Sequence, residues 1–127
     1  MRNTLLPGFA AMSVTIYHNP RCSKSRATLK LLQEKGIEPR IVKYLETPPS
    51  AEELREIVRL LGLSSPRELM RRKEKEYKEL GLDDPTLSDD ALIEAMVKHP
   101  RMIERPIVIA NGKAAIGRPP ENVLAIL

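Results

Sequence analysis

The sequence predicts an α/β fold in which a β-α-β segment opens the chain, a helical insertion follows, and a β-β-α segment closes it. Three observations support this order. Runs of β-forming residues lie near both ends of the chain, whereas the middle shows the periodicity of amphipathic helices. The pair Asn111-Gly112, a strong signal for a two-residue hairpin, separates the last two β-forming runs. A chain of 127 residues can bury one modest core.

The opening segment contains two predicted strands and one predicted helix. Residues 14–17 are β-branched or aromatic, which favours a strand. Alanine and leucine residues then recur with helical spacing until Gly36, a typical helix terminator. Residues 40–45 mix β-forming and charged residues and are expected to form the second strand. Two strands joined by one helix predict a parallel pair with a right-handed crossover.

The helical insertion begins after a proline-rich break. Ser50 and Glu53 have the spacing of a capping box, and the helix that they start is expected to end at Gly62. Ser65-Pro66 is expected to open a short helix, followed by a charged segment that ends at Gly81.

The closing segment follows one more helix. That helix is expected to begin at Ser88 and to close at His99-Pro100. Residues 106–110 and 113–117 then form the two arms of the predicted hairpin, and residues 120–127 are expected to form a final short helix.

A parallel opening and an antiparallel close make up the arrangement of thioredoxin and glutaredoxin. In that arrangement a cis-proline precedes the third strand, beside the active thiol, and Arg105-Pro106 is the candidate here. X–Pro bonds are trans by default. We expect residues 13–127 to form a single domain of this thioredoxin/glutaredoxin-like fold. Residues 1–12 are expected to be a flexible leader rather than a signal peptide, because Pro7-Gly8 interrupts their apolar run.

Composition excludes several classes of protein. The net charge is +4, but acidic and basic residues interleave, and one Phe and three Tyr are too few for base-stacking platforms, so we expect no nucleic-acid partner. No run approaches the length of a membrane span. One cysteine and two histidines predict neither a disulfide nor a Cys-rich metal site. A lone reactive thiol belongs in a reducing compartment, which favours the cytoplasm.

The lone cysteine, Cys22, lies at the expected junction between the first strand and the first helix. Free N–H groups and the positive dipole end favour a thiolate there, and Arg21, Lys24 and Arg26 add positive charge. The same N–H groups can hold an oxyanion. Cys22 could instead be a buried, inert thiol, although its charged neighbours disfavour that interpretation. A tyrosine-phosphatase loop is excluded by spacing, because Thr28 stands where that loop requires arginine.

Cys22 and Ser25 have the spacing of a C-x-x-C redox motif with serine in the second position. If Cys22 is catalytic, an outside thiol must therefore complete the cycle. His18 either orients the thiolate or holds the turn as a structural histidine, and Ser25 either donates a hydrogen bond to sulfur or is a simple first-turn serine. Arg105 and Arg118 lie in tight turns near one sheet edge and have the planar fork that binds oxyanions.

Several motifs in a consistent order make the chain similar to the glutaredoxin-coupled arsenate reductase family (ArsC-type), in particular its small bacterial arsenate-reductase-like branch. The resemblance covers about residues 14–127. It is carried by residues 16–26 (IYHNPRCSKSR), 44–49 (YLETPP), 67–71 (RELMR), 104–108 (ERPIV) and 116–119 (IGRP).

The resemblance implies roles for six residues. Cys22 would be the nucleophile, supported by His18 and Ser25, and the anion would be bound by Arg71, Arg105 and Arg118. It also implies a reaction in which the thiolate attacks arsenate to give a thioarsenate, glutathione attacks next, and glutaredoxin reduces the mixed species so that arsenite leaves. Glutathione is then a co-substrate, no metal or prosthetic group is bound, and we expect a monomer.

Two other functions fit the same residues. One is a glutathione-dependent thiol reductase with another substrate. The other is a binding protein like the Spx transcription regulators, which share the fold and contact RNA polymerase. Those regulators typically carry C-x-x-C as a switch, which Ser25 removes here.

Overall fold

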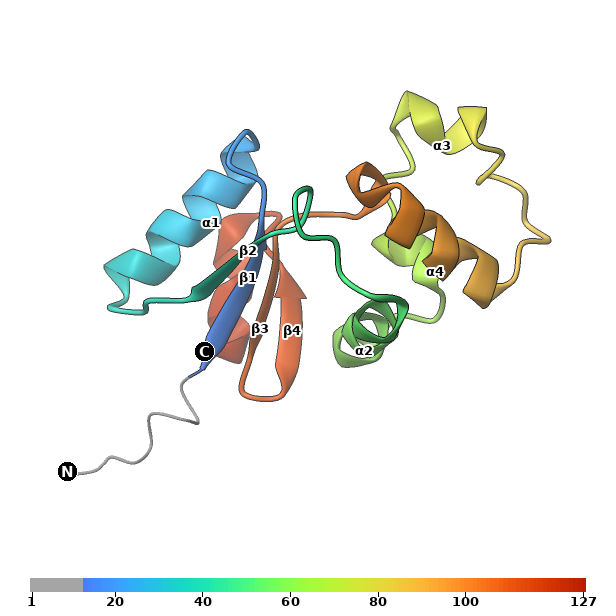
Figure 1. The fold of residues 1–127 in the computed structure, drawn as a ribbon. Helices are drawn as coiled ribbons and strands as arrows, with labels where there is room; N and C mark the ends of the chain where they lie inside the picture. Colours follow the sequence, from blue (N-terminus) through green and yellow to red (C-terminus); the bar gives the residue numbers. More distant parts are fainter. Residues whose placement is uncertain (1–12) are drawn as a thin grey trace. The chain divides into compact units, whose positions relative to one another are not determined.

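The computed structural model describes residues 13–127, and the leader expected at residues 1–12 lies outside them (Figure 1). The described chain divides into two compact units. The first ends at Lys43 and resumes over Arg105–Leu127, and the second is Tyr44–Glu104. The expectation of one domain over residues 13–127 stays a prediction, and each unit is described by itself.

The first unit contains a four-stranded sheet in the order β2-β1-β3-β4. Its strands are β1 (Val14–His18), β2 (Arg40–Lys43), β3 (Ile107–Ala110) and β4 (Lys113–Ile116). β1 is parallel to β2 and antiparallel to β3, and β3 is antiparallel to β4. The predicted parallel pair, hairpin and α/β fold class are therefore confirmed. β2 is shorter than the expected strand over residues 40–45, because the chain turns at Tyr44, where the second unit begins.

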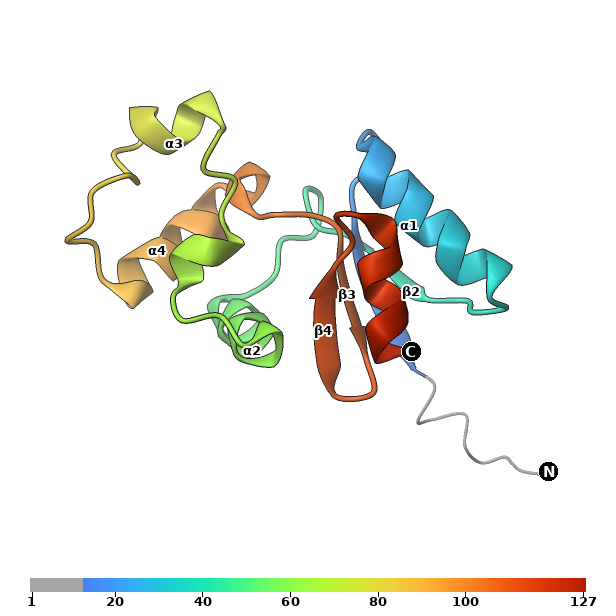
Figure 2. The same ribbon diagram turned by 180° about the vertical axis from the view of Figure 1, so that it is seen from behind.

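Two helices cover one face of this sheet. Figure 2 shows α1 (Ser23–Glu34) and the dark red C-terminal helix η4 (Pro120–Ile126) side by side, and the two are in contact. η4 is a 3-10 helix rather than an α-helix. The core beneath them is made of apolar side chains, among them Val14, Ile16, Leu32, Val108 and Val123. This face fixes the height of α1 above the sheet and so places the first turn of α1 beside the end of β1.

The β3–β4 hairpin closes as its sequence predicts. Asn111 and Gly112 have φ angles of 55° and 70°, as the favoured two-residue turn requires. The Asn111 side chain also donates a hydrogen bond of 2.9 Å to the carbonyl of Ile126, which ties the turn to η4.

The second unit is helical. It contains α2 (Ala51–Leu61), η2 (Pro66–Leu69), α3 (Lys75–Glu79), α4 (Asp89–Lys98) and η3 (Pro100–Met102). The capping box of Ser50 and Glu53 is present with both hydrogen bonds, and Gly62 ends α2 in the left-handed conformation with φ 69°. The buried core of the unit includes Leu54, Ile57, Leu92, Ile93 and Met96.

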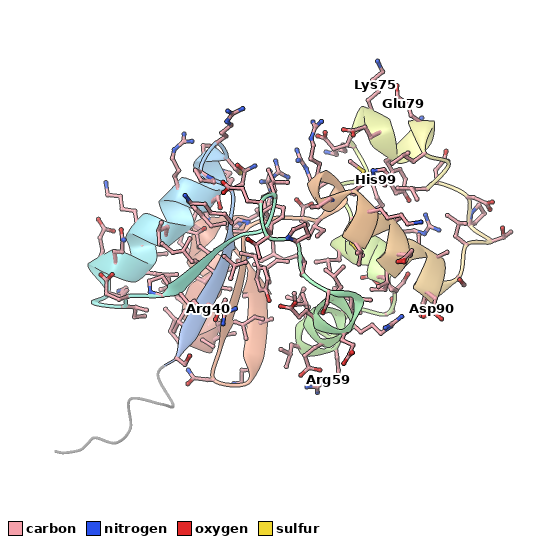
Figure 3. The ribbon with its side chains drawn as sticks, in the orientation of Figure 1. Arg40, Arg59, Lys75, Glu79, Asp90 and His99 are labelled. Atoms are coloured by element: carbon pink, nitrogen blue, oxygen red, sulfur yellow. The ribbon has the colours of Figure 1, made fainter. Side chains whose placement is uncertain are left out.

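Arg67 organises the charged segment of the second unit. Its guanidinium donates to the Tyr77 hydroxyl and to the backbone carbonyls of Leu82 and Asp84, the last at 2.8 Å. Lys75 and Glu79 stand together on α3 (Figure 3), with Nζ and Oε2 3.6 Å apart. Acidic and basic side chains thus pair on this surface, as the interleaved sequence predicted.

Two X–Pro bonds of the first unit are cis. Arg105-Pro106, the candidate from the sequence, is one of them, and Arg118-Pro119, which the sequence did not suggest, is the other. Within residues 13–127, no helix has both the length and the apolar character needed to cross a membrane.

Candidate active site

Cys22 is the N-cap of α1, between the end of β1 and the first helical turn. Its backbone is extended, with φ −94° and ψ 124°, while its carbonyl accepts the N–H of Arg26 at 3.0 Å. Its own N–H donates to the carbonyl of Asn19 at 3.0 Å, which closes the loop before the helix. The side chain is only partly buried. The sulfur therefore stands at the positive end of the helix and within reach of solvent, as the sequence predicted.

The surroundings of the sulfur favour the thiolate. Burial raises the pKa of Cys22, but the backbone N–H groups of Ser25 and Lys24 and the charge and hydrogen bond of Arg105 together hold that pKa below its ordinary value. Nη1 of Arg118 lies 3.9 Å from Sγ. A nucleophilic thiol is one whose pKa is lowered in this way.

His18 and Ser25 form a buried pair behind the cysteine. The two side chains are 6% and 0% exposed, and His18 Nδ1 lies 2.9 Å from Ser25 Oγ. Ser25 Oγ also accepts the N–H of Asn19 at 3.0 Å. Burial lowers the pKa of His18, and the charges of Lys43 and Arg26 lower it further. A histidine of lowered pKa is neutral at neutral pH, so the pair braces the loop without adding charge to the site.

The hydroxyl of Ser25 is thus directed at His18, while its backbone N–H acts on the sulfur. Of the alternatives left open by the sequence, the contacts favour a structural histidine that holds the turn. The catalytic roles that the resemblance assigns to His18 and Ser25 stay predictions.

The loop before Cys22 is held by its own side chains. Asn19 Oδ1 accepts the N–H of Arg21 at 3.0 Å, a turn that asparagine commonly forms. Nη1 of Arg26 donates to the carbonyl of Pro20 at 3.0 Å. Arg26 therefore fixes the loop and reaches the thiol region only as a nearby charge.

Arg71 belongs to the second unit, and its contacts are described there. Its N–H donates to the carbonyl of Met102 at 2.8 Å, and Nη2 lies 2.8 Å from Glu74 Oε2. Nη1 points to the carbonyl of Arg101 at 3.4 Å. The structure therefore brings together Cys22, Arg105 and Arg118, whereas the anion-binding role of Arg71 stays a prediction.

Two residues next to the site were not found from the sequence as site residues. Thr28, which was considered only to exclude a phosphatase loop, is fully buried against Gly117, the residue before Arg118. Asn122 donates to the carbonyls of Arg118 and Ile116 at 3.2 and 3.4 Å. The signal available in the sequence was only the glycine beside the arginine in the 116–119 motif.

Comparison with known proteins follows from this geometry. The family model described as "ArsC family" matches residues 17–126. The protein "Uncharacterized protein YfgD" of Escherichia coli strain K12 is 64% identical over 114 residues, which cover 90% of this chain and 96% of that protein. The "Arsenate reductase" of Neisseria meningitidis serogroup A is 60% identical over 114 residues, which cover 90% and 97% of the two chains.

Among solved structures, the "Arsenate reductase from Vibrio cholerae" matches with a TM-score of 0.90 and 62% identity. The match covers 92% of this chain and 99% of that one. This similarity confirms the thioredoxin-like fold expected from the order of the elements. With a family model that spans nearly all of the described residues and relatives of this identity, the chain belongs to the ArsC family.

Proposed function

We propose that the protein reduces arsenate to arsenite with electrons from glutathione and glutaredoxin, and that Cys22 is the nucleophile. The observation that carries the proposal is a single thiol of lowered pKa beside two arginines, Arg105 and Arg118. The names of relatives about as similar as the Neisseria and Vibrio proteins support arsenate as the oxyanion.

The first step is attack of the Cys22 thiolate on arsenic(V). The sulfur forms a bond to arsenic, and one arsenate oxygen leaves as water after protonation. Arg105 and Arg118 would hold the remaining oxygens, since guanidinium groups bind oxyanions through paired hydrogen bonds. The free N–H groups at the start of α1 would offer further donors.

The later steps take two electrons from outside thiols. Glutathione replaces a second oxygen on arsenic and releases water. Glutaredoxin then attacks the glutathione sulfur, so that a mixed disulfide of the two outside thiols leaves while arsenic falls from +5 to +3. Water finally displaces Cys22, which returns as a thiol, and arsenite is released. Ser25 cannot supply a second sulfur, so the cycle depends on these partners.

The remaining features of the proposal come from the family resemblance and the chemistry. Arg71 stays a predicted anion ligand on the resemblance alone. We place the protein in the cytoplasm, where glutathione keeps thiols reduced. We propose no bound metal or prosthetic group and no nucleic-acid partner, and we propose that the protein acts as a monomer.

The test is turnover of purified protein with arsenate, glutathione and glutaredoxin, followed by NADPH consumption through glutathione reductase. Arsenate-dependent consumption that is lost when either thiol partner is omitted would support the proposal. No consumption with arsenate, together with glutathione-dependent reduction of another oxidised substrate, would point instead to a thiol reductase of different specificity. Binding to RNA polymerase without any turnover would indicate a regulator like Spx.

A further inference from the structure

A buried contact between α1 and the end of β4 adjoins both arginines of the site. Thr28 on α1 is 0% exposed, and Gly117 is also buried. Gly117 directly precedes Arg118, and its N–H donates at 3.0 Å to the carbonyl of Pro106, which directly follows Arg105. One junction is therefore connected through the backbone to both guanidinium groups.

Gly117 has no room for a side chain at this junction. A Cβ built there would collide with Oγ1 of Thr28, and it would lie 2.9 Å from Cγ of Pro106 and 3.0 Å from Cγ2 of Thr28. The backbone of Gly117 is not in the left-handed region, unlike that of Gly112. Glycine is therefore required here by the close approach of Thr28 and Pro106, and not by the backbone conformation.

Thr28 connects the same junction to the first turn of α1. Its hydroxyl donates to the carbonyl of Lys24 at 2.8 Å, and the carbonyl of Gly117 lies 3.4 Å from the same oxygen. The N–H of Lys24 is one of the groups that favour the Cys22 thiolate. Thr28 thus touches both the turn that supports the sulfur and the strand end that carries Arg118.

We propose that Thr28 and Gly117 are positioning residues that set the separation between the Cys22 sulfur and the guanidinium groups of Arg105 and Arg118. The inference rests on the proposed function, because it assigns these residues to the same site. The attraction between a thiolate and a cation falls with distance, and a shift of about 1 Å at an active site can reduce a rate by about a hundredfold. A contact without slack is a direct way to hold that distance.

The central experiment measures the alkylation rate of Cys22 by iodoacetamide as a function of pH. Cys22 is the only cysteine, so the rate reports on this site alone. Gly117→Ala should push the end of β4 away from α1, raise the pKa of Cys22, and lower the alkylation rate near neutral pH by about three- to tenfold. The KM for arsenate should rise together with this change.

The matched control is Gly112→Ala in the same hairpin. Gly112 has φ 70° and open space around its Cα, so alanine there strains the backbone without touching the junction. The control should lose stability and keep the wild-type alkylation profile. An equal shift in both variants would overturn the proposal, because it would show a general loss of stability.

Compensation is the second arm. Thr28→Ala removes both Thr28 atoms that an alanine at Gly117 would meet, so the double variant should recover much of the reactivity that Gly117→Ala loses. If Gly117→Ala does not fold, Thr28→Val, which keeps the shape and removes the hydroxyl, should shift the thiol pKa upward in its place. An unchanged alkylation profile in Gly117→Ala, or in Thr28→Val when that variant is used, would overturn the proposal. Alkylation needs no arsenate, so failure of the reductase assignment would leave this result readable.

Discussion

The N-termini of α1 and α2 use the same free backbone N–H groups in opposite ways. At α2, Ser50 and Glu53 form a complete capping box, and two acidic residues lie in the first turn. At α1, Cys22 makes no side-chain capping hydrogen bond, and the first turn holds no acidic residue. The start of α2 is neutralised by its own side chains, which stabilises the helix. The start of α1 keeps its positive potential for a thiolate and, as we propose, for an oxyanion.

The difference is not a failure of the sequence to cap a helix. α4 also has a conventional cap, because Ser88 Oγ accepts the N–H of Ala91 at 3.1 Å and Asp89 and Asp90 follow it. Of these three helices, only the one that begins beside Arg105 and Arg118 lacks such a cap. A cap that contributes about 1 kcal/mol elsewhere is absent where it would compete with the sulfur.

The strongest way to break this comparison is Cys22→Ser. Because serine is not activated by a lowered pKa in this setting, we expect arsenate reduction to fall by at least about a thousandfold. NADPH-coupled turnover measures it, with the neighbouring Ser23→Ala as a matched control that should keep most of its activity. Activity that persists in Cys22→Ser would falsify the nucleophile assignment.

Removal of the cations is the next largest change. Arg105→Ala should raise the pKa of Cys22 more than Arg118→Ala does, because Arg105 supplies both charge and a hydrogen bond, whereas Arg118 lies 3.9 Å from the sulfur. We expect oxyanion affinity to fall on the order of tenfold in each variant. The pH dependence of alkylation and the KM for arsenate give the two readings. Exposed Arg21→Ala is the control, and equal effects of all three substitutions would reduce the arginines to a general surface charge.

The capping box of α2 sharpens the comparison from the other side. Ser50→Ala should lower the free energy of unfolding by about 1 kcal/mol, since it leaves the N–H of Glu53 without its partner. Urea unfolding measures this loss. The alkylation rate of Cys22 should stay at its wild-type value, and a changed rate would mean that helix stability alone tunes the thiol.

The smallest effect concerns pH and stability. The folded-state pKa of Cys22 lies below that of the unfolded chain, so ionisation stabilises the fold most above the ordinary thiol pKa of about 8.5. That stabilisation is lost as the pH falls through the folded-state pKa. The free-energy difference between wild type and Cys22→Ser should therefore move in favour of the wild type as the pH rises over this interval. At lower pH the serine variant should be the more stable by up to about 1 kcal/mol, because serine is the better neutral cap. Unfolding at a series of pH values tests the sign, and a difference independent of pH would contradict it.

Local signals carried most of what could be predicted about the fold. The capping box at Ser50, the hairpin at Asn111-Gly112 and the helix end at Gly62 each depend on neighbours within a few residues, and each is present. The strand expected over residues 40–45 ends early because the chain leaves the sheet at Tyr44, which strand propensity does not report. Likewise, the sequence of the last helix does not distinguish α from 3-10 geometry.

The site was predictable where it depends on residue type and hidden where it depends on distant contacts. Cys22, Arg105 and Arg118 could be named from their motifs. The contact of Thr28 with Gly117 joins residues 89 positions apart, and no local pattern announces it. The partner of the Ser25 hydroxyl also emerged only from three-dimensional geometry, since sulfur and imidazole were equally open to it.

The buried Ser25–His18 pair has a consequence for how the protein ages under oxidants. With its hydroxyl held at this place, the molecule has no internal means to quench a damaged sulfur by closing a ring. Peroxide would leave Cys22 as a sulfenic acid that waits for a small thiol to cap it. Survival during an oxidative burst would then follow the ambient supply of reductant, and not any property of the polypeptide itself.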